Sequence, residues 1–211
     1  MSHLIQDSIR DGSLVLYHDY RAGHALDLSG NGNHGTLGGA DARFDRNGFV
    51  NGYYGSGYVT VPHSASINLT TLTVVMLIVP KRITQYTTGT RLFSKGSVAT
   101  RVIDVYEAAT GQIVQDTAGT DCNWPLVREF SGIQCYGINL ANNTITPIYL
   151  DGIFDTNANT GPTVGTNTDS LHVGNISGLS RGFGRTISSF LMWNRLLTAD
   201  EHRQAYLELL K

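Results

Sequence analysis

Apolar and polar residues alternate along much of the chain, in short runs separated by residues that favour turns. The runs are rich in β-branched and aromatic side chains, which is typical of β-strands. Glycine, asparagine, aspartate and threonine fill the segments between them. Many short strands without alternating helices favour a sandwich or barrel. The predicted strands are Leu14 to Tyr20, Tyr58 to Val61, Leu72 to Val79, Arg101 to Glu107, Ile133 to Ile138, Thr144 to Leu150 and Arg185 to Trp193.

The last segment of the chain carries the signature of a helix. Thr198 and Glu201 have the spacing of a capping box, in which the hydroxyl and the carboxylate each accept a backbone amide of the other residue. The predicted helix covers residues 198–210, with Ala205 and Leu209 in its packing stripe. We interpret it as a short C-terminal helix that closes the sandwich.

The 211 residues suit one large β-sandwich, since such folds span roughly 200–250 residues as a single domain. We find no repeat of fixed period and no domain boundary, so residues 1–211 are predicted to form one domain. Residues 1–12 form an N-terminal arm in this interpretation. The segment from Asp155 to Asp169 offers almost nothing to bury, and it is predicted to be a long exposed loop.

The charge balance argues against two classes of partner. Fifteen Lys and Arg residues against 17 Asp and Glu residues give a net charge of −2, without the basic patch that nucleic-acid binding requires. No stretch approaches the ~20 apolar residues of a spanning helix, and no Sec-type signal peptide is recognised. We expect a soluble product of cytoplasmic synthesis, which is compatible with assembly into a virion or at a cell surface.

Two cysteines, Cys122 and Cys135, have twelve residues between them in a glycine-rich region. The spacing is compatible with a bridge that closes a hairpin and equally with two reduced thiols. Since disulfides accompany oxidising compartments, the missing export signal favours the thiols.

The segment Asp27 to Leu37, DLSGNGNHGTL, is built for tight turns, because its glycines and asparagines accept positive φ angles. Five further segments follow in a fixed order. The ordered set resembles the laminin-G-like, concanavalin A-type family of bacterial and phage proteins. The resemblance implies an all-β fold of two antiparallel sheets in a jelly roll, with one face or rim used for binding. The segments are GSGYVTVPHSASINL, LFSKG, IYLDG, LHVG and MWNRLLTADE.

The resemblance also makes calcium a candidate ligand, because hard oxygen atoms bind calcium in such folds. Asp27 matches the family, and carbonyl groups near Asn31 and Asn33 are the other candidates. However, Ser188 and Ser189 stand where the family commonly has an acidic pair. The sequence leaves a calcium site and a loop held by backbone hydrogen bonds as alternatives, and the missing acids favour the loop.

One predicted strand is apolar on both faces. Leu72, Val74, Met76 and Ile78 occupy the core positions of the resemblance, and alternation puts a second apolar set on the opposite face. Either the chain's own loops or helix cover that set, or another subunit does. In the second case the face marks assembly into a homo-oligomer or particle. The set consists of Val75, Leu77, Val79 and, on another strand, Leu191.

A search for catalytic patterns predicts that the chain is not an enzyme. A polysaccharide-cleaving member of the family would need clustered acids of Glu-x-Asp-x-x-Glu type, and Asp104 and Glu107 have the wrong parity to share a strand face. We find no zinc-ligand spacing, no nucleophile elbow, and no phosphate or dinucleotide loop.

Glycan binding needs aromatic planes for sugar faces, and amides or carboxylates for hydroxyls. The alternative is that the aromatic residues fill the core or cover loop bases. The sequence thus favours a non-catalytic recognition or attachment module that binds glycan or protein at rim loops. A structural protein of a larger particle, such as a phage capsid-decoration or tail component, is second, and a polysaccharide-active enzyme is third. The candidate ligand-binding residues are Tyr53, Tyr54, Tyr86, Asp121, Asn123 and Trp124.

Overall fold

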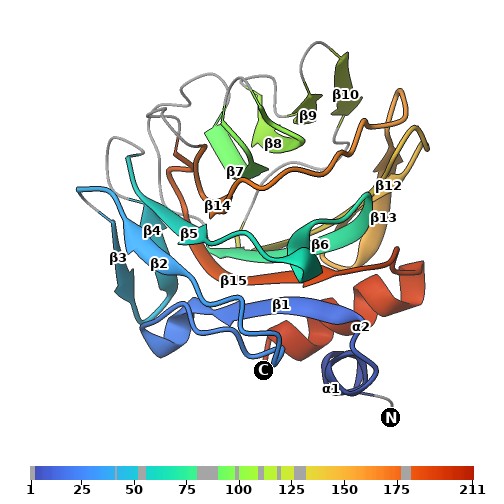
Figure 1. The fold of residues 1–211 in the computed structure, drawn as a ribbon. Coiled ribbons are helices and arrows are strands. Elements are labelled where there is room, and N and C mark those ends of the chain that lie inside the picture. The colour runs from blue at the N-terminus through green and yellow to red at the C-terminus, as the bar shows by residue number, and fades with distance from the viewer. Residues whose placement is uncertain are drawn as a thin grey trace.

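In the residues that it describes, the computed structural model of the chain contains two packed antiparallel sheets, two α-helices and two short 3-10 helices (Figure 1). It describes residues 3–40, 42–51, 56–79, 90–97, 100–108, 112–117, 120–125, 132–176 and 182–211. The predicted all-β, two-sheet antiparallel sandwich is confirmed.

Sheet A is eight-stranded and sheet B is seven-stranded. In sheet A, β1 pairs with β15 outside the main strand order. In spatial order sheet A is β13 (Ile153–Asn157), β12 (Pro147–Leu150), β11 (Gln134–Ala141), β6 (Thr71–Val79), β15 (Thr186–Trp193), β4 (Gly48–Asn51) and β3 (Ala42–Asp45), with β1 (Leu14–Asp19). Sheet B is β10 (Thr120–Trp124), β9 (Ile113–Thr117), β8 (Ile103–Glu107), β7 (Thr90–Lys95), β14 (Leu171–Val173), β5 (Tyr58–Val61) and β2 (Thr36–Gly38).

The main core lies between the two sheets and follows the alternation of the strands. On the central strand β6, Leu72, Val74, Met76 and Ile78 all point into it, as the sequence predicts. Each is at most 1% exposed. Burial of such side chains contributes about 25 cal/mol per Å² of apolar surface, so this strand is a major source of stability.

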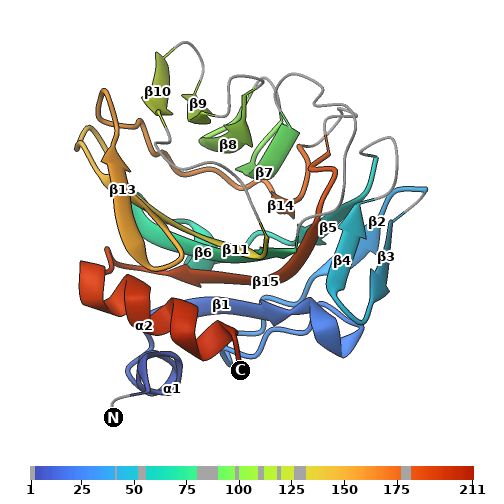
Figure 2. The same cartoon turned by 180° about the vertical axis from the view of Figure 1, so that it is seen from behind.

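The outer face of sheet A is covered by the chain's own helices. Figures 1 and 2 show α1 (Leu4–Arg10) and α2 (Ala199–Leu209) on the side of sheet A that faces away from sheet B. Beneath them Val75, Leu77 and Leu191 are 1%, 4% and 0% exposed, while Val79 is half-buried. The alternative in which another subunit covers Val75, Leu77 and Leu191 is therefore wrong. Their helix-side neighbours include Leu4, Ile5, Ala205 and Leu209.

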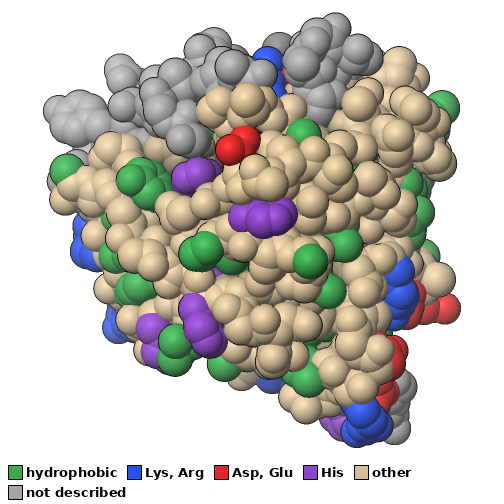
Figure 3. Space-filling view, viewed as in Figure 1, with side chains coloured by type: hydrophobic (Ala, Val, Ile, Leu, Met, Phe, Trp, Pro, Cys, Tyr) green, Lys and Arg blue, Asp and Glu red, His purple; other side chains and the backbone are tan. Residues whose placement is uncertain are grey.

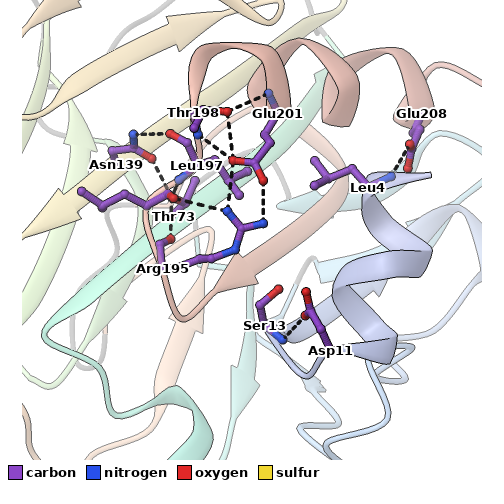
Figure 4. Close-up of polar contacts among 11 residues, drawn as sticks. Leu4, Asp11, Ser13, Thr73, Asn139, Arg195, Leu197, Thr198, Glu201 and Glu208 are labelled. Atoms are coloured by element: carbon purple, nitrogen blue, oxygen red, sulfur yellow. Dashed lines mark hydrogen bonds and ion pairs between the residues drawn. The ribbon is translucent and has the colours of Figure 1, made fainter. Parts of the chain in front are cut away.

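Within the predicted N-terminal arm, residues 4–10 form the helix α1, which docks against α2. The Glu208 carboxylate of α2 accepts the backbone amide of Leu4 at 2.8 Å (Figure 4) and that of Ile5 at 3.0 Å. The first amides of a helix lack intrahelical acceptors, so this carboxylate satisfies two of them. The capping box of α2, formed by Thr198 and Glu201, is confirmed.

The segment from Asp155 to Asp169 is only in part the exposed loop predicted. Its first residues belong to β13, and Ala158 and Val164 are 5% and 2% exposed. The Ala158 amide donates to Thr146 O at 3.0 Å. The segment is an anchored crossover from sheet A to sheet B, because small apolar side chains and backbone hydrogen bonds hold it down.

The two cysteines are free thiols on opposite sides of sheet A. Cys122 lies in the core between the sheets, whereas Cys135 lies under the helices. Of the two alternatives, the hairpin bridge is therefore wrong and the favoured one, two reduced thiols, holds. None of the helices in the described part of the chain is long and apolar enough to cross a membrane.

Candidate functional site

The glycine-asparagine loop is organised around one carboxylate. Asp27 Oδ1 accepts the amides of Tyr17 (3.0 Å) and Ser29 (2.9 Å). Its Oδ2 accepts Ser29 Oγ and the Asn33 amide, both at 2.9 Å. Burial disfavours the charge, but these hydrogen bonds outweigh it and hold the pKa of Asp27 below its usual value.

The asparagines of the loop serve the same internal network. Asn31 Nδ2 donates to Leu14 O at 3.2 Å, and Asn33 Nδ2 donates to Val15 O at 2.7 Å. Asn33 Oδ1 already accepts the Ser64 hydroxyl at 2.6 Å. A calcium ion requires several free oxygen ligands, and here donors occupy the carboxylate of Asp27 and the amide oxygen of Asn33. These three residues do not fit a calcium site, and they form the hydrogen-bonded loop of the alternative interpretation.

The two serines that stand where the resemblance implies an acidic pair are buried. Ser188 and Ser189 are 1% and 0% exposed, and Ser188 Oγ donates to the backbone oxygen of Asn47. Among the described residues, no group of three or more His, Cys, Asp or Glu side chains is arranged to hold a metal ion.

The predicted ligand-binding residues separate into three groups. Tyr53, Tyr54 and Tyr86 lie outside the described residues. Trp124 is a correction, because it is 0% exposed in the core and its Nε1 donates to Thr146 O at 2.9 Å. Its neighbour Asn123 is half-buried on the opposite face of β10. Asp121 pairs with Asp116 of β9 in the backbone register.

Asn123 borders a cluster on the outer face of sheet B that the sequence analysis missed. We call this cluster the charged face. Tyr106 lies opposite Arg91 in one neighbouring strand and opposite Val114 in the other, and Val114 lies opposite Asn123. The charged face consists of Arg91, Arg101, Asp104, Tyr106 and Asp116.

Ion pairs and a ring contact hold the charged face together. Arg91 contacts both carboxylate oxygens of Asp104, with Nη2 to Oδ2 at 2.8 Å and Nε to Oδ1 at 2.9 Å. The same guanidinium lies 4.3 Å from the centre of the Tyr106 ring. Arg101 Nη2 donates to Asp116 Oδ2 at 2.6 Å, and its Nε lies 3.9 Å from Asp104 Oδ2. The four charges sum to zero.

The charged face has a buried ion pair beneath and partly exposed side chains above it. Burial raises the pKa of Asp104, while its hydrogen bonds and ion pair with Arg91 oppose this shift. Both members of that pair are almost fully buried, whereas the side chains of Arg101 and Asp116 remain 15% and 18% exposed. Tyr106 is also partly exposed. A ligand can therefore reach an aromatic ring, a guanidinium and a carboxylate on one surface.

The acids and the serine nearby do not form hydrolytic machinery. Asp104 faces outward, but Glu107 pairs with Arg185 at 3.1 Å on the side facing sheet A, as the parity of the strand predicts. Ser94 lies between Asp104 and His172 in the register of sheet B. Its hydroxyl donates to Asn175 O at 3.1 Å, so no activated serine results.

Solved structures establish the fold type. Domain 4 of an extracellular arabinanase from Geobacillus stearothermophilus, in complex with arabinotriose, matches with a TM-score of 0.71 and 13% identity over 94% of this chain and 98% of that domain. This chain is a concanavalin A-like jelly roll. The jelly roll also matches botulinum neurotoxin type C, described as depending on two ganglioside molecules for cell entry, with a TM-score of 0.70, 12% identity, and coverage of 95% of this chain and 52% of that one. Trypanosoma rangeli sialidase matches with a TM-score of 0.68, 16% identity, and coverage of 93% and 33%. No protein-family model and no curated protein sequence matches the chain.

The signal that would have found the charged face is the alternation itself. In β8, Ile103 and Val105 enter the core of the jelly roll, so Asp104 and Tyr106 must share the outer face. That pattern predicts a polar face containing a ring. The pairing with Arg101 comes from a loop, and sequence spacing does not reveal it.

Proposed function

We propose that this chain is a non-catalytic, laminin-G-like recognition module that binds a glycan at the charged face and Asn123. The observation that carries the proposal is the partly exposed Tyr106 ring beside the Arg101–Asp116 pair. The match to an arabinanase domain solved with arabinotriose supports it.

The chemistry of the site suits sugar recognition. An aromatic ring offers an apolar plane to the C–H face of a sugar, while guanidinium and carboxylate groups donate to and accept from adjacent hydroxyls. The buried Arg91–Asp104 pair fixes the ring and the outer pair from beneath, so these side chains lose little conformational entropy on binding. Because the four charges cancel, we expect a neutral glycan in preference to a sialylated or uronate-containing one.

The test measures glycan-array binding of the full chain, followed by calorimetric titration of each hit. Tyr106→Phe keeps the ring and should bind within about threefold of the natural chain. Tyr106→Leu should lose about 1–2 kcal/mol, or roughly tenfold in affinity, since stacking contributes on that order. Asn123→Ala should also weaken binding, while the exposed turn residue Asn47 provides the matched control Asn47→Ala.

Three results would contradict the proposal. Equal affinity of Tyr106→Phe and Tyr106→Leu, with unchanged melting temperatures, would place the ligand elsewhere. A blank array together with capture of a defined protein would favour protein attachment. Turnover of a polysaccharide by the purified chain would overturn the non-catalytic assignment.

The particle alternative has lost its main argument, because α1 and α2 cover Val75, Leu77 and Leu191. On the face drawn in colour in Figure 3, exposed hydrophobic side chains are scattered instead of gathered into one patch. No observation on the described residues therefore favours assembly over recognition.

A further inference from the structure

A lysine side chain lies in a cage of oxygen atoms at the rim next to the charged face. Lys95 is the last residue of β7 and is 1% exposed. Its ammonium donates to Asn167 O, Asn167 Oδ1 and Asp169 O, each at 2.9 Å. Nδ1 of His63 lies 3.4 Å away. Three oxygen ligands from one short segment thus converge on a single positive charge.

The cage extends to a second loop. The Asp169 carboxylate accepts Thr100 Oγ1 at 2.6 Å and Asn167 Nδ2 at 3.0 Å. Asn167 Nδ2 also donates to Thr100 O at 2.9 Å. The loop before β14 and the loop after β7 are therefore joined through Asn167 and Asp169, whose carbonyl oxygens are turned toward Lys95.

Arg101, the reachable cation of the charged face, directly follows Thr100. The Val102 amide donates to the backbone oxygen of Lys95 at 2.9 Å, which fixes the backbone on the other side of Arg101. Arg101 is thus held between Thr100, which hydrogen bonds to the cage residues Asn167 and Asp169, and Val102, which the Lys95 backbone holds. The guanidinium reaches Asp116 from there.

We propose that the Lys95 ammonium is a built-in cation that positions Arg101, in the manner of a metal ion that joins the loops of a binding rim. The positioning role rests on the proposed glycan site, but the cation cage itself does not. Three uncharged oxygens at 2.9 Å suit an ammonium ion, whereas calcium takes six to eight ligands at shorter distances. Burial lowers the pKa of Lys95, and the negative charge of Asp169 opposes this shift.

The experiment compares Lys95→Ala with Lys95→Met. The alanine variant leaves both the cage and the channel of the lost side chain open, whereas methionine fills the channel without a charge. n-Propylammonium replaces the three methylenes and the ammonium that alanine lacks. We expect it to raise the thermal unfolding midpoint of Lys95→Ala by several degrees above the effect of equimolar tetramethylammonium. It should leave Lys95→Met and the natural chain unchanged.

Glycan affinity provides the positioning readout. Lys95→Ala should bind at least tenfold more weakly, and n-propylammonium should restore most of that loss, while calcium and EDTA should change nothing. The proposal would be overturned if n-propylammonium changed the unfolding midpoints of Lys95→Ala and Lys95→Met equally, or if calcium restored the glycan affinity of Lys95→Ala. If the midpoint is rescued and the natural chain binds no glycan, the cation cage stands and the proposed function fails.

A second measurement applies if Lys95→Ala does not fold. The chain has three lysines, Lys81, Lys95 and Lys211, so ¹⁵N-lysine labelling gives a simple ammonium spectrum. We expect one slowly exchanging ammonium signal in the natural chain that is absent from Lys95→Arg. Rapid exchange of all three signals would contradict a caged ammonium.

Discussion

Two buried histidines should make the jelly roll sensitive to mild acid. His202 is 2% exposed, its Nε2 donates to Asn139 Oδ1 at 3.1 Å, and its ring stacks on Tyr149 at 3.9 Å. His18 is 0% exposed, and its Nε2 donates to Asn33 O at 2.9 Å. Burial lowers the pKa of His18 to about 4 and that of His202 to about 3, from an ordinary value of 6.5. Both rings therefore stay neutral in the folded chain at pH 5.

The sign of the effect follows from proton binding. Between pH 6.5 and the lowered folded-state values, the unfolded chain binds more protons than the folded chain, so stability falls as the pH falls. At pH 5 the loss relative to pH 7 is about 2 kcal/mol for each histidine, or ~4 kcal/mol together. That is a large share of the 5–15 kcal/mol that roughly spans domain stabilities.

The assay is urea unfolding at pH 7 and pH 5 for the natural chain and His202→Gln. The glutamine amide can still donate to Asn139, but it does not titrate in this range. The natural chain should lose about 2 kcal/mol more than the variant between the two pH values. Asp104 and Glu107, whose pKa values burial raises, act in the opposite direction but equally in both proteins. An equal pH dependence in the two proteins would refute the assignment of His202 as a buried neutral ring.

Two further predictions concern the carboxylates that organise backbone amides. Asp27→Asn places an amide group against donors that the carboxylate accepts, and it should lower the free energy of unfolding in urea by about 3 kcal/mol; a loss below about 1 kcal/mol would contradict the role given to Asp27. Glu208→Gln should weaken the attachment of α1 by about 1 kcal/mol. Amide exchange should then accelerate in residues 4–10 and not in β1, so equal exchange in the variant and natural chains would count against the Glu208 anchor.

The seven strands predicted from the sequence all overlap strands of the structure, because alternation is a local property, but the other strands, β7, β9 and β10 among them, were not predicted. In β6 the side chains of Leu72 and Val74 enter the core because neighbouring residues of a strand point to opposite sides. The same rule identified Val75 and Leu77 as a second apolar face. The C-terminal helix was also predictable, since its capping box needs only Thr198 and Glu201.

The sequence did not predict that α1 covers the second apolar face of sheet A, because the formation of α1 depends on a distant residue. A helix of seven residues is unstable by itself, since nucleation costs more than so few hydrogen bonds return. Leu4 and Ile5 become helical where Glu208, 204 residues from Leu4, accepts their amides. Nothing in the local pattern of residues 1–12 indicates that partner.

Two strands of the candidate site, β9 and β10, were not predicted from the sequence, so strand parity was not applied to their residues. Asn123 and Trp124 are adjacent in a strand, so they cannot both contact a ligand on one face. Trp124 lies in the core with Cys122, and Asn123 therefore faces outward. Applying this separation to β8 and β9 as well brings Tyr106 and Asp116 to the same side as Asn123. The remaining unknown was Arg101, whose loop position depends on Lys95.

Two loops of this fold show why a turn-making motif does not by itself identify a metal site. Backbone amides that converge need a negative partner, and Asp27 provides it for the glycine-asparagine loop. Converging carbonyl oxygens need a positive partner, and the Lys95 ammonium provides it for Asn167 and Asp169. A side chain and a bound ion can meet either requirement equally well. The sequence specifies the turn through its glycines and asparagines, but the origin of the compensating charge depends on contacts such as that between Lys95 and Asn167, which only the fold brings together.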